Sequence, residues 1–318
     1  MKATAISNSN IAFLKYWGKK NIETNIPMNK SISMTLDENL STKTTVEFSE
    51  KYETDILILN GKTETGNKLK RVSEFLDILR GLKNTKLRAK VVSNNTFPTG
   101  SGIASSASGF SALCAAAQMA LGLNLSMREI SKYSRLGSGS ATRSVYGGFC
   151  EWENEFAMQI ENETHWQELR DIVVIVLETE KKVGSRDAMI KTVNESKLYE
   201  KRLENLGKKV EKIKNTIIDK NFSELAENMM EDSDNMHACI REIGIEYLSE
   251  KSYEIKELIK TYNNEGIKAA YTFDAGPNAH VITTENEVET LIPLLSKYGK
   301  IIISKPGTGI KITENHLF

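Results

Sequence analysis

The chain has 318 residues, of which 40% are hydrophobic and 26% charged, a composition typical of a soluble globular protein with one large or two smaller domains. Lys plus Arg equals Asp plus Glu at 42 each, which argues against a partner such as nucleic acid or a membrane surface attracted by overall charge. The three cysteines lie far apart without metal-ligand spacing, and no apolar run is long enough to span a membrane. We therefore expect a cytoplasmic protein without a structural metal, a signal peptide or a transmembrane helix.

The first 92 residues predict an antiparallel sheet followed by a helix and one more strand. Three short runs of strand-forming residues end at the turn signal Asn60-Gly61. Apolar residues then recur at helical spacing until residue 82. The expected strands are 31–36, 42–48, 55–59 and 87–92, and the expected helix is 67–82.

Residues 94–121 combine glycines and serines with an alanine-rich apolar run, which indicates a loop that leads into a buried helix. The unpaired N–H groups and partial positive charge of a helix N-terminus bind anions, and small residues let a ligand approach them. We therefore interpret the loop as a phosphate cradle, although a Gly/Ser loop that only caps a core helix fits the same pattern. A capping box formed by Ser126 and Glu129 predicts a second helix over 126–136.

The second half of the chain predicts a smaller sheet with long helices. The β-branched run 172–177 indicates a strand buried on both faces and marks the passage into a second domain. We expect amphipathic helices over 198–218 and 222–239, strands over 267–273, 280–283 and 300–304, and a helix over 288–298.

Three further clusters have unusual composition. Residues 15–20 join two aromatics with three cations, residues 136–148 place Arg143 among small hydroxyl residues and glycines, and Asp274 follows a predicted strand. Such groups can clamp an anion or hold a carboxylate with a shifted pKa. Each cluster also has a structural explanation: a basic turn with a buried Trp, a connecting loop, and a turn-forming Asp.

Taken together and in this order, the motifs resemble the mevalonate diphosphate decarboxylase family of the galactokinase, homoserine kinase, mevalonate kinase and phosphomevalonate kinase superfamily. The resemblance runs along nearly the whole chain. It rests on residues 10–12, 15–19, 27–29, 31–33, 98–109, 137–148, 185–189, 233–237 and 273–278.

The resemblance implies a two-domain α+β fold of the small-molecule-kinase superfamily. It implies a ribosomal-S5-like α/β domain over residues 1–180 and a ferredoxin-like α+β domain over 181–318, with the active site between them and a homodimer as the assembly. The ligand would be a phosphorylated mevalonate, from which a carboxy-lyase of isoprenoid synthesis removes CO2.

The resemblance also assigns roles to residues. Asp274 would lie beside the C3 oxygen, Arg143 would hold the C1 carboxylate, and Lys15 would lie close to both. The residues that would grip the 5-phosphate end are Tyr16, Lys19, Ser138, Ser140, Ser185 and Arg186. The loop that would face the transferred or expelled phosphate comprises Gly100, Ser101, Gly102, Ser105, Ser106 and Ser108.

Two departures from the family pattern bear on the substrate. Lys30 adds a cation near the phosphate region, and residues 241–245 replace the usual Pro-Pro segment with a sequence more like that of archaeal mevalonate 3-kinase. We therefore favour, narrowly, a decarboxylase of mevalonate 3,5-bisphosphate that needs no cofactor, with Lys30 helping to hold the 3-phosphate. The alternatives are a decarboxylase that uses MgATP on mevalonate 5-diphosphate or 5-phosphate, a superfamily kinase, and a non-catalytic ligand sensor.

Overall fold

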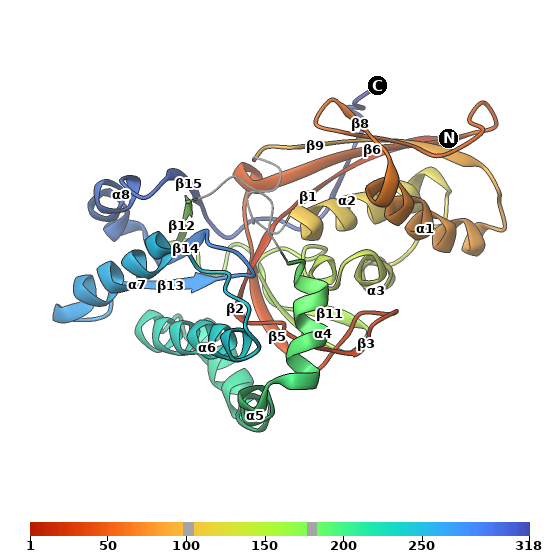
Figure 1. Cartoon of the computed structure of the whole chain (residues 1–318). Coiled ribbons are helices and arrows are strands. Elements are labelled where there is room, and N and C mark those ends of the chain that lie inside the picture. Colours follow the sequence, from red (N-terminus) through yellow and green to blue (C-terminus); the bar gives the residue numbers. More distant parts are fainter. Residues whose placement is uncertain (98–104, 177–182) are drawn as a thin grey trace.

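The computed structural model describes residues 1–97, 105–176 and 183–318. Figure 1 shows a group of three helices beside a long sheet at one side of the molecule and a second group of helices around a smaller sheet at the other. The predicted boundary between residues 180 and 181 lies outside the described residues. Gly100, Ser101 and Gly102 of the predicted phosphate loop also lie outside them.

The N-terminal part is built on a six-stranded sheet in the order β16-β1-β6-β9-β7-β8. Neighbouring strands run antiparallel except β7 and β9, which run parallel, so this sheet is mixed. The prediction of one antiparallel sheet over the first 60 residues is therefore wrong, because the expected strand 31–36 also belongs to a different sheet. The strands are β1 (Lys2–Asn8), β6 (Ser41–Ser49), β7 (Ile56–Leu59), β8 (Lys62–Glu64), β9 (Arg88–Asn95) and β16 (Lys311–Thr313). Residues from nearly opposite ends of the chain therefore pair, as in Thr4 with Thr313.

Three helices, α1 (Gly66–Lys83), α2 (Ser105–Ala120) and α3 (Met127–Gly137), complete this part. α2 packs on β1 and β6, and it is buried almost all round because alanines and serines let the backbone approach the sheet. α3 starts with the predicted capping box, in which Ser126 and Glu129 accept each other's backbone N–H. The helices predicted at 67–82 and 126–136 are thus confirmed.

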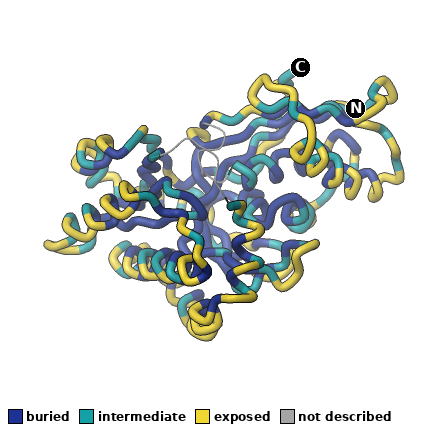
Figure 2. The backbone as a smooth tube through the Cα atoms, viewed as in Figure 1, coloured by how far each residue is buried: buried dark blue, intermediate teal, exposed yellow. Residues whose placement is uncertain are grey.

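A second, four-stranded sheet in the order β11-β10-β5-β2 carries several residues toward the centre of the molecule. Its strands are β2 (Asn10–Leu14), β5 (Ser31–Thr35), β10 (Phe149–Glu153) and β11 (Phe156–Glu161), and the short pair β3 (Lys19–Asn21) and β4 (Ile26–Pro27) follows β2. All residues of β2 and β5 are buried. The central strands form the dark interior in Figure 2, with exposed residues along the outer helices.

The C-terminal part has an antiparallel sheet in the order β13-β14-β12-β15. Its strands are β12 (Leu169–Ile175), β13 (Ala269–Phe273), β14 (Ala279–Thr284) and β15 (Lys300–Ser304). The helices are α4 (Ser185–Glu195), α5 (Lys197–Ile218), α6 (Phe222–Glu242), α7 (Glu250–Tyr262) and α8 (Val288–Ser296), and short 3-10 helices cover Glu38–Leu40, Gly139–Thr142, Asn263–Glu265 and Glu285–Glu287. The expected strands and helices of this half are confirmed, whereas α4 and α7 were not predicted.

Residues 172–175 of β12 are apolar without interruption because both faces of this strand are buried. Val173 packs in the core formed with α5, α6 and the four-stranded sheet of β2, whereas Ile172 and Val174 pack on the opposite face against α7 and α8. Because β12 pairs with β14 and β15, it belongs to the C-terminal sheet although it precedes residue 180. We therefore propose that the division between the two parts lies between β11 and β12.

Replacing Gly137 with alanine is expected to destabilise the protein by about 1–3 kcal/mol. The added Cβ would lie 2.0 Å from Cδ1 of Phe110. That ring is held between Phe75 and the Arg71 guanidinium, so it has little room to move.

The matched control is Gly207→Ala in α5, where a Cβ meets nothing within 4 Å. There, alanine should stabilise by about 0.5–1 kcal/mol because glycine is a poor helix former. Urea unfolding measures both variants, and equal midpoints would contradict the packing argument.

Candidate active site

Most of the sequence-predicted site residues meet at a cavity of about 510 Å³ between the two parts of the molecule. Its wall includes the segment after β2, the starts of α2 and α4, the 3-10 turn after α3, and the segment after β13. The predicted residues that line it are Lys15, Tyr16, Lys19, Ser105, Ser106, Ser138, Ser140, Arg143, Ser185, Arg186 and Asp274.

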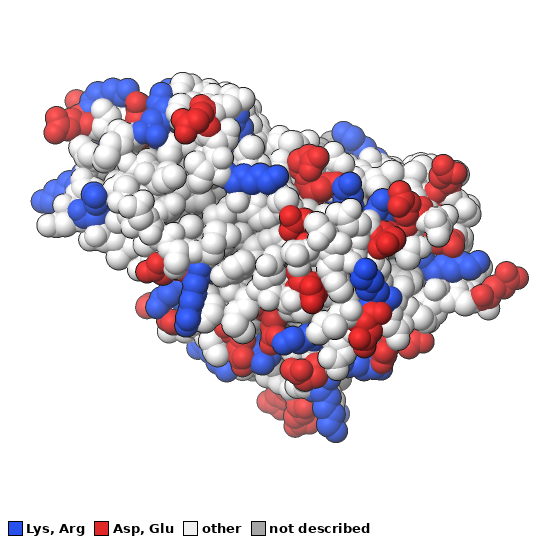
Figure 3. All heavy atoms as spheres, turned by 180° about the vertical axis from the view of Figure 1, so that it is seen from behind, with Lys and Arg blue, Asp and Glu red and all other residues white. Residues whose placement is uncertain are grey.

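Positive charge dominates this cavity. Five cations line it, namely Lys15, Lys19, Arg71, Arg143 and Arg186, whereas Asp274 is the one carboxylate among its described lining residues. On the molecular face in Figure 3, by contrast, acidic and basic side chains are interspersed. The cavity therefore concentrates positive charge in a chain whose net charge is zero, which suits a ligand with several negative charges.

Lys15 and Asp274 form an ion pair with 2.8 Å between Nζ and Oδ1. Lys15 follows β2 and is only 2% exposed, whereas Asp274 follows β13 and is 30% exposed. Burial alone would raise the pKa of Asp274, but Lys15, His280 and Arg143 more than offset this effect and lower it to about 2. Asp274 is therefore an ionised carboxylate that can accept a hydrogen bond from a ligand.

Arg143 is buried beside this pair and has fixed partners. Its Nη1 donates to Ser31 Oγ at 2.8 Å, while Nε and Nη2 donate to Asn10 Oδ1 at 3.2 and 3.0 Å. Burial lowers the pKa of Arg143 to about 10, against the opposing influence of Asp274 and Tyr16. The guanidinium thus stays charged at neutral pH and is held rigidly by neutral groups. An anion can therefore still bind to it.

Tyr16 and Lys19 come from the same segment as Lys15. Tyr16 packs edge-on against Trp152, and its buried hydroxyl has no hydrogen-bond partner among the described residues. Lys19 donates to Asn25 Oδ1 at 2.6 Å. Burial, followed by the charges of Arg186 and Arg71, lowers the pKa of Lys19 to about 8. An unpartnered hydroxyl and cations that repel one another fit a site for phosphate oxygens.

The serines divide into two groups. Ser138 Oγ lies 3.1 Å from Ser106 Oγ and 3.3 Å from Ser140 Oγ. All three serines line the cavity together with Ser105. Ser108 does not line it, because its buried hydroxyl bonds Ser9 and Thr42 and ties α2 to the sheet. Ser108 therefore has a structural role here, one turn away from the cavity wall.

Lys30 also lies outside the cavity lining. Its Nζ pairs with Glu151 at 3.1 Å and with Glu153 at 3.0 Å, both on β10. Hydrogen bonds to the carboxylates of Glu153 and Glu151 raise the pKa of Lys30. The hypothesis that Lys30 holds a phosphate is therefore not supported by its position.

Several lining residues were missed by the sequence reasoning. Arg71 reaches the cavity from α1 and donates from Nη2 to the Gly137 carbonyl at 2.6 Å. Its sequence context is that of an ordinary helix surface, so no local signal distinguishes it from neighbouring cations. Other missed lining residues are Ala12, Trp17, Asn25, Gly137, Gly139, Met189, Met236 and Ala275.

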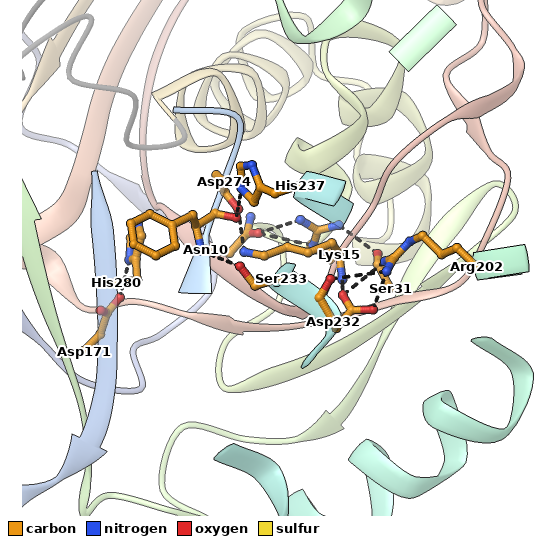
Figure 4. A network of polar contacts seen from close by, with 12 residues as sticks. Asn10, Lys15, Ser31, Asp171, Arg202, Asp232, Ser233, His237, Asp274 and His280 are labelled. Carbon is orange, nitrogen blue, oxygen red and sulfur yellow. Dashed lines mark hydrogen bonds and ion pairs between the residues drawn. The ribbon is translucent and has the colours of Figure 1, made fainter. Parts of the chain in front are cut away.

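His237 and His280 are both buried. His280 shares a hydrogen bond of 2.7 Å with Asp171, and His237 lies with Nε2 3.4 Å from the Phe273 carbonyl (Figure 4). Burial, followed by the charge of Lys15, lowers the pKa of His237 to about 3. Among residues 1–97, 105–176 and 183–318, no group of three or more His, Cys, Asp or Glu could hold a metal ion, and no helix could cross a membrane.

Two family models match the chain. The diphosphomevalonate decarboxylase-like N-terminal domain matches residues 7–162, and the mevalonate 5-diphosphate decarboxylase C-terminal domain matches residues 171–311. The chain belongs to the diphosphomevalonate decarboxylase family. Members of this family are carboxy-lyases, so the predicted enzyme class is confirmed. The gap between the two matches agrees with a division between β11 and β12.

Relatives in the decarboxylase family match along almost the whole chain. The diphosphomevalonate decarboxylase of Candida albicans is 39% identical, with 93% of this chain and 88% of that protein aligned. The crystal structure of mevalonate diphosphate decarboxylase from Staphylococcus aureus is 36% identical and superposes with a TM-score of 0.93 over 98% of each chain. A structure described as MDDEF in complex with MVAPP, AMPPCP and magnesium is 37% identical, with a TM-score of 0.92 over 99% of each chain. The predicted two-domain α+β fold is thus confirmed.

Pyrophosphate, used as a probe, should bind this cavity more weakly above pH 8. Lys19 with a pKa of about 8 loses its proton there, and an anion binds the protonated form more tightly. Calorimetry of the wild type and of Lys19→Arg, which stays charged, separates this effect from the titration of pyrophosphate itself. The wild type should lose about fivefold in affinity relative to the variant between pH 8 and pH 9, as its protonated fraction falls. Parallel pH profiles would show that Lys19 does not titrate in this range.

Proposed function

We propose that this chain is an ATP-dependent decarboxylase of mevalonate 5-diphosphate, which forms isopentenyl diphosphate. The observation that carries the proposal is the cavity, where five cations surround one ionised carboxylate that is paired with a buried lysine. A substrate with a diphosphate at one end, a carboxylate at the other and a hydroxyl between them matches these groups. The relatives named diphosphomevalonate decarboxylase, aligned along most of their length, support the same substrate.

The diphosphate end would lie where, in the part of the chain that the structure describes, cations and hydroxyl donors gather without a carboxylate partner. Tyr16 offers a hydroxyl without a partner among the described residues, and Lys19, Arg71 and Arg186 offer positive charges. Burial, followed by repulsion between these cations, lowers the pKa values of Lys19 and Arg71. An anion bound there removes that repulsion. Ser138, Ser140 and Ser185 would add hydroxyl donors to the same end.

The reacting end would lie at Arg143 and Asp274. Arg143 would hold the C1 carboxylate until it leaves as neutral CO2, and its bonds to Asn10 and Ser31 fix that position. Asp274 would accept a hydrogen bond from the 3-hydroxyl and orient its oxygen. As the C3–O bond breaks, the same carboxylate would stabilise the positive charge that develops at C3. The electrons of the breaking C–C bond then form the new double bond.

The residues present also fit a nucleotide beside the substrate. Ser105 and Ser106 open α2, the helix that follows the Gly/Ser segment in sequence, and both line the cavity. They would hold phosphate groups of MgATP, which supplies the phosphoryl group that makes the 3-oxygen a leaving group. The structure with AMPPCP and magnesium supports this reading over a reaction without a cofactor.

The narrow preference for mevalonate 3,5-bisphosphate receives no support from the comparisons. The relatives of this chain are named diphosphomevalonate decarboxylases. Lys30, one basis of the preference for the bisphosphate, is paired with Glu151 and Glu153 outside the cavity. The likeness of residues 241–245 to archaeal mevalonate 3-kinase is therefore no reason to place the chain in an archaeal branch. The homodimer stays a prediction. The assignment of the residues that would bind the 5-phosphate end also stays a prediction.

CO2 release decides between the substrates. We expect the protein to release CO2 and phosphate from mevalonate 5-diphosphate only when MgATP is present. Mevalonate 3,5-bisphosphate without nucleotide should yield none. CO2 from the bisphosphate alone, or consumption of ATP without CO2, would reject the proposal in favour of the bisphosphate decarboxylase or of a kinase.

Asp274→Asn should lower kcat by about 10³-fold or more, because the amide carries no charge to stabilise C3 and leaves Lys15 without its counter-ion. Binding of mevalonate 5-diphosphate, measured by calorimetry, should persist because Tyr16, Lys19 and Arg186 are unchanged. Lys30→Gln is the control, since Lys30 is paired with glutamates outside the cavity, and it should keep kcat within about twofold. Wild-type turnover in Asp274→Asn would remove Asp274 from the mechanism.

A further inference from the structure

A buried ion pair behind the cavity joins α5 to α6. Arg202 Nη1 lies 2.8 Å from Asp232 Oδ1, Nη2 donates to Oδ2 at 3.1 Å, and both side chains are almost fully buried. Neither residue lines the cavity. A buried ion pair contributes little net stability compared with well-packed apolar residues, so its presence calls for another explanation.

The ion pair also holds the backbone that carries Lys15. Asp232 Oδ2 accepts the N–H of Lys15 at 2.7 Å, just after β2 ends at Leu14. Figure 4 shows Asp232 between Arg202 and the Lys15 backbone, while the Lys15 side chain extends toward Asp274. Because Asp232 lies on a helix of 21 residues, this bond fixes the start of the Lys15 side chain against a rigid element.

The same stretch of α6 holds the residue before Asp274. Ser233 Oγ accepts the N–H of Phe273 at 3.0 Å, and His237 Nε2 lies 3.4 Å from the Phe273 carbonyl. Residues 232, 233 and 237 span about one and a half helical turns. One short segment of α6 therefore holds the backbone next to both members of the Lys15–Asp274 pair, although these two residues follow strands of different sheets.

We propose that Asp232, neutralised by Arg202, is a positioning residue that sets the distance between Lys15 Nζ and Asp274 through the Lys15 backbone, with Ser233 fixing the Asp274 side. This inference deepens the proposed function and rests on it, because the pair matters for catalysis only if Asp274 faces the reacting carbon. A displacement of about 1 Å at such a centre can cost about 10²-fold in rate. The carboxylate is needed as an acceptor, and the arginine is needed to neutralise it.

Two double variants that differ in one group test the proposal. Asp232→Leu with Arg202→Met removes both charges and the acceptor, and Asp232→Asn with Arg202→Met removes both charges but keeps an acceptor for the Lys15 N–H. Replacement of a buried ion pair by apolar residues is tolerated in other proteins, so both variants should fold. Their urea midpoints check this.

The leucine variant should lose about 30-fold or more in kcat, with KM for mevalonate 5-diphosphate within about threefold of wild type. The asparagine variant should keep kcat within about threefold. A merely structural role would change the urea midpoints and leave the two kcat values equal, which would overturn the proposal.

A crystal structure of each variant gives a readout that does not depend on turnover. The Lys15 Nζ to Asp274 Oδ1 separation, 2.8 Å here, should exceed hydrogen-bond distance in the leucine variant and persist in the asparagine variant. If the wild type releases no CO2, the proposed function fails while this distance still tests the positioning. An intact pair in the leucine variant overturns the inference.

Ser233→Ala keeps the proposal testable if the leucine variant does not fold. Loss of this acceptor frees the Phe273 N–H beside Asp274, so kcat should fall several-fold at unchanged KM. Wild-type kcat in a folded Ser233→Ala protein contradicts the role of α6 in holding Asp274.

Discussion

The ion pair between Lys15 and Asp274 is the constraint on which the rest of the site depends. Burying an unpaired lysine or aspartate is costly, so the two residues must meet or change protonation state. They lie 259 positions apart and follow strands of different sheets, and α6 contacts both strands. The arrangement of the two parts of the molecule is therefore coupled to the chemistry of one carboxylate.

The cations of the cavity are a second constraint. They stabilise a bound anion, but without an anion they repel one another and destabilise the folded protein. Lys19 and Arg71 both have lowered pKa values, first through burial and then through neighbouring arginines. Well below pH 8, where Lys19 is fully charged, the folded state bears this repulsion in full, and an anionic ligand relieves it. Ligand binding and folding stability are thus linked, and the apolar cores on both faces of β12 must offset the repulsion.

The local sequence pattern predicted those helices and strands whose formation depends mainly on their own residues. Helical spacing predicted α1, α5 and α6, the capping box predicted the start of α3, and the apolar run of β12 indicated burial on both faces. Position in the site is different, because it depends on distant contacts. Arg71 looks like any surface cation of a helix, Lys30 acquires its glutamate partners from β10, and Asp232 acquires its role only from the Lys15 backbone.

The pairing of β16 with β1 has a consequence for how the molecule assembles. Thr313, the partner of Thr4, is synthesised 309 residues later. β16 therefore cannot pair with β1 while the ribosome is still making the C-terminal helices. Contacts of such high sequence separation are slow to form, and an open strand edge can pair with other chains meanwhile. During synthesis, one edge of β1 is therefore open to intermolecular pairing until β16 has been made, and completion of its sheet is among the last steps of folding.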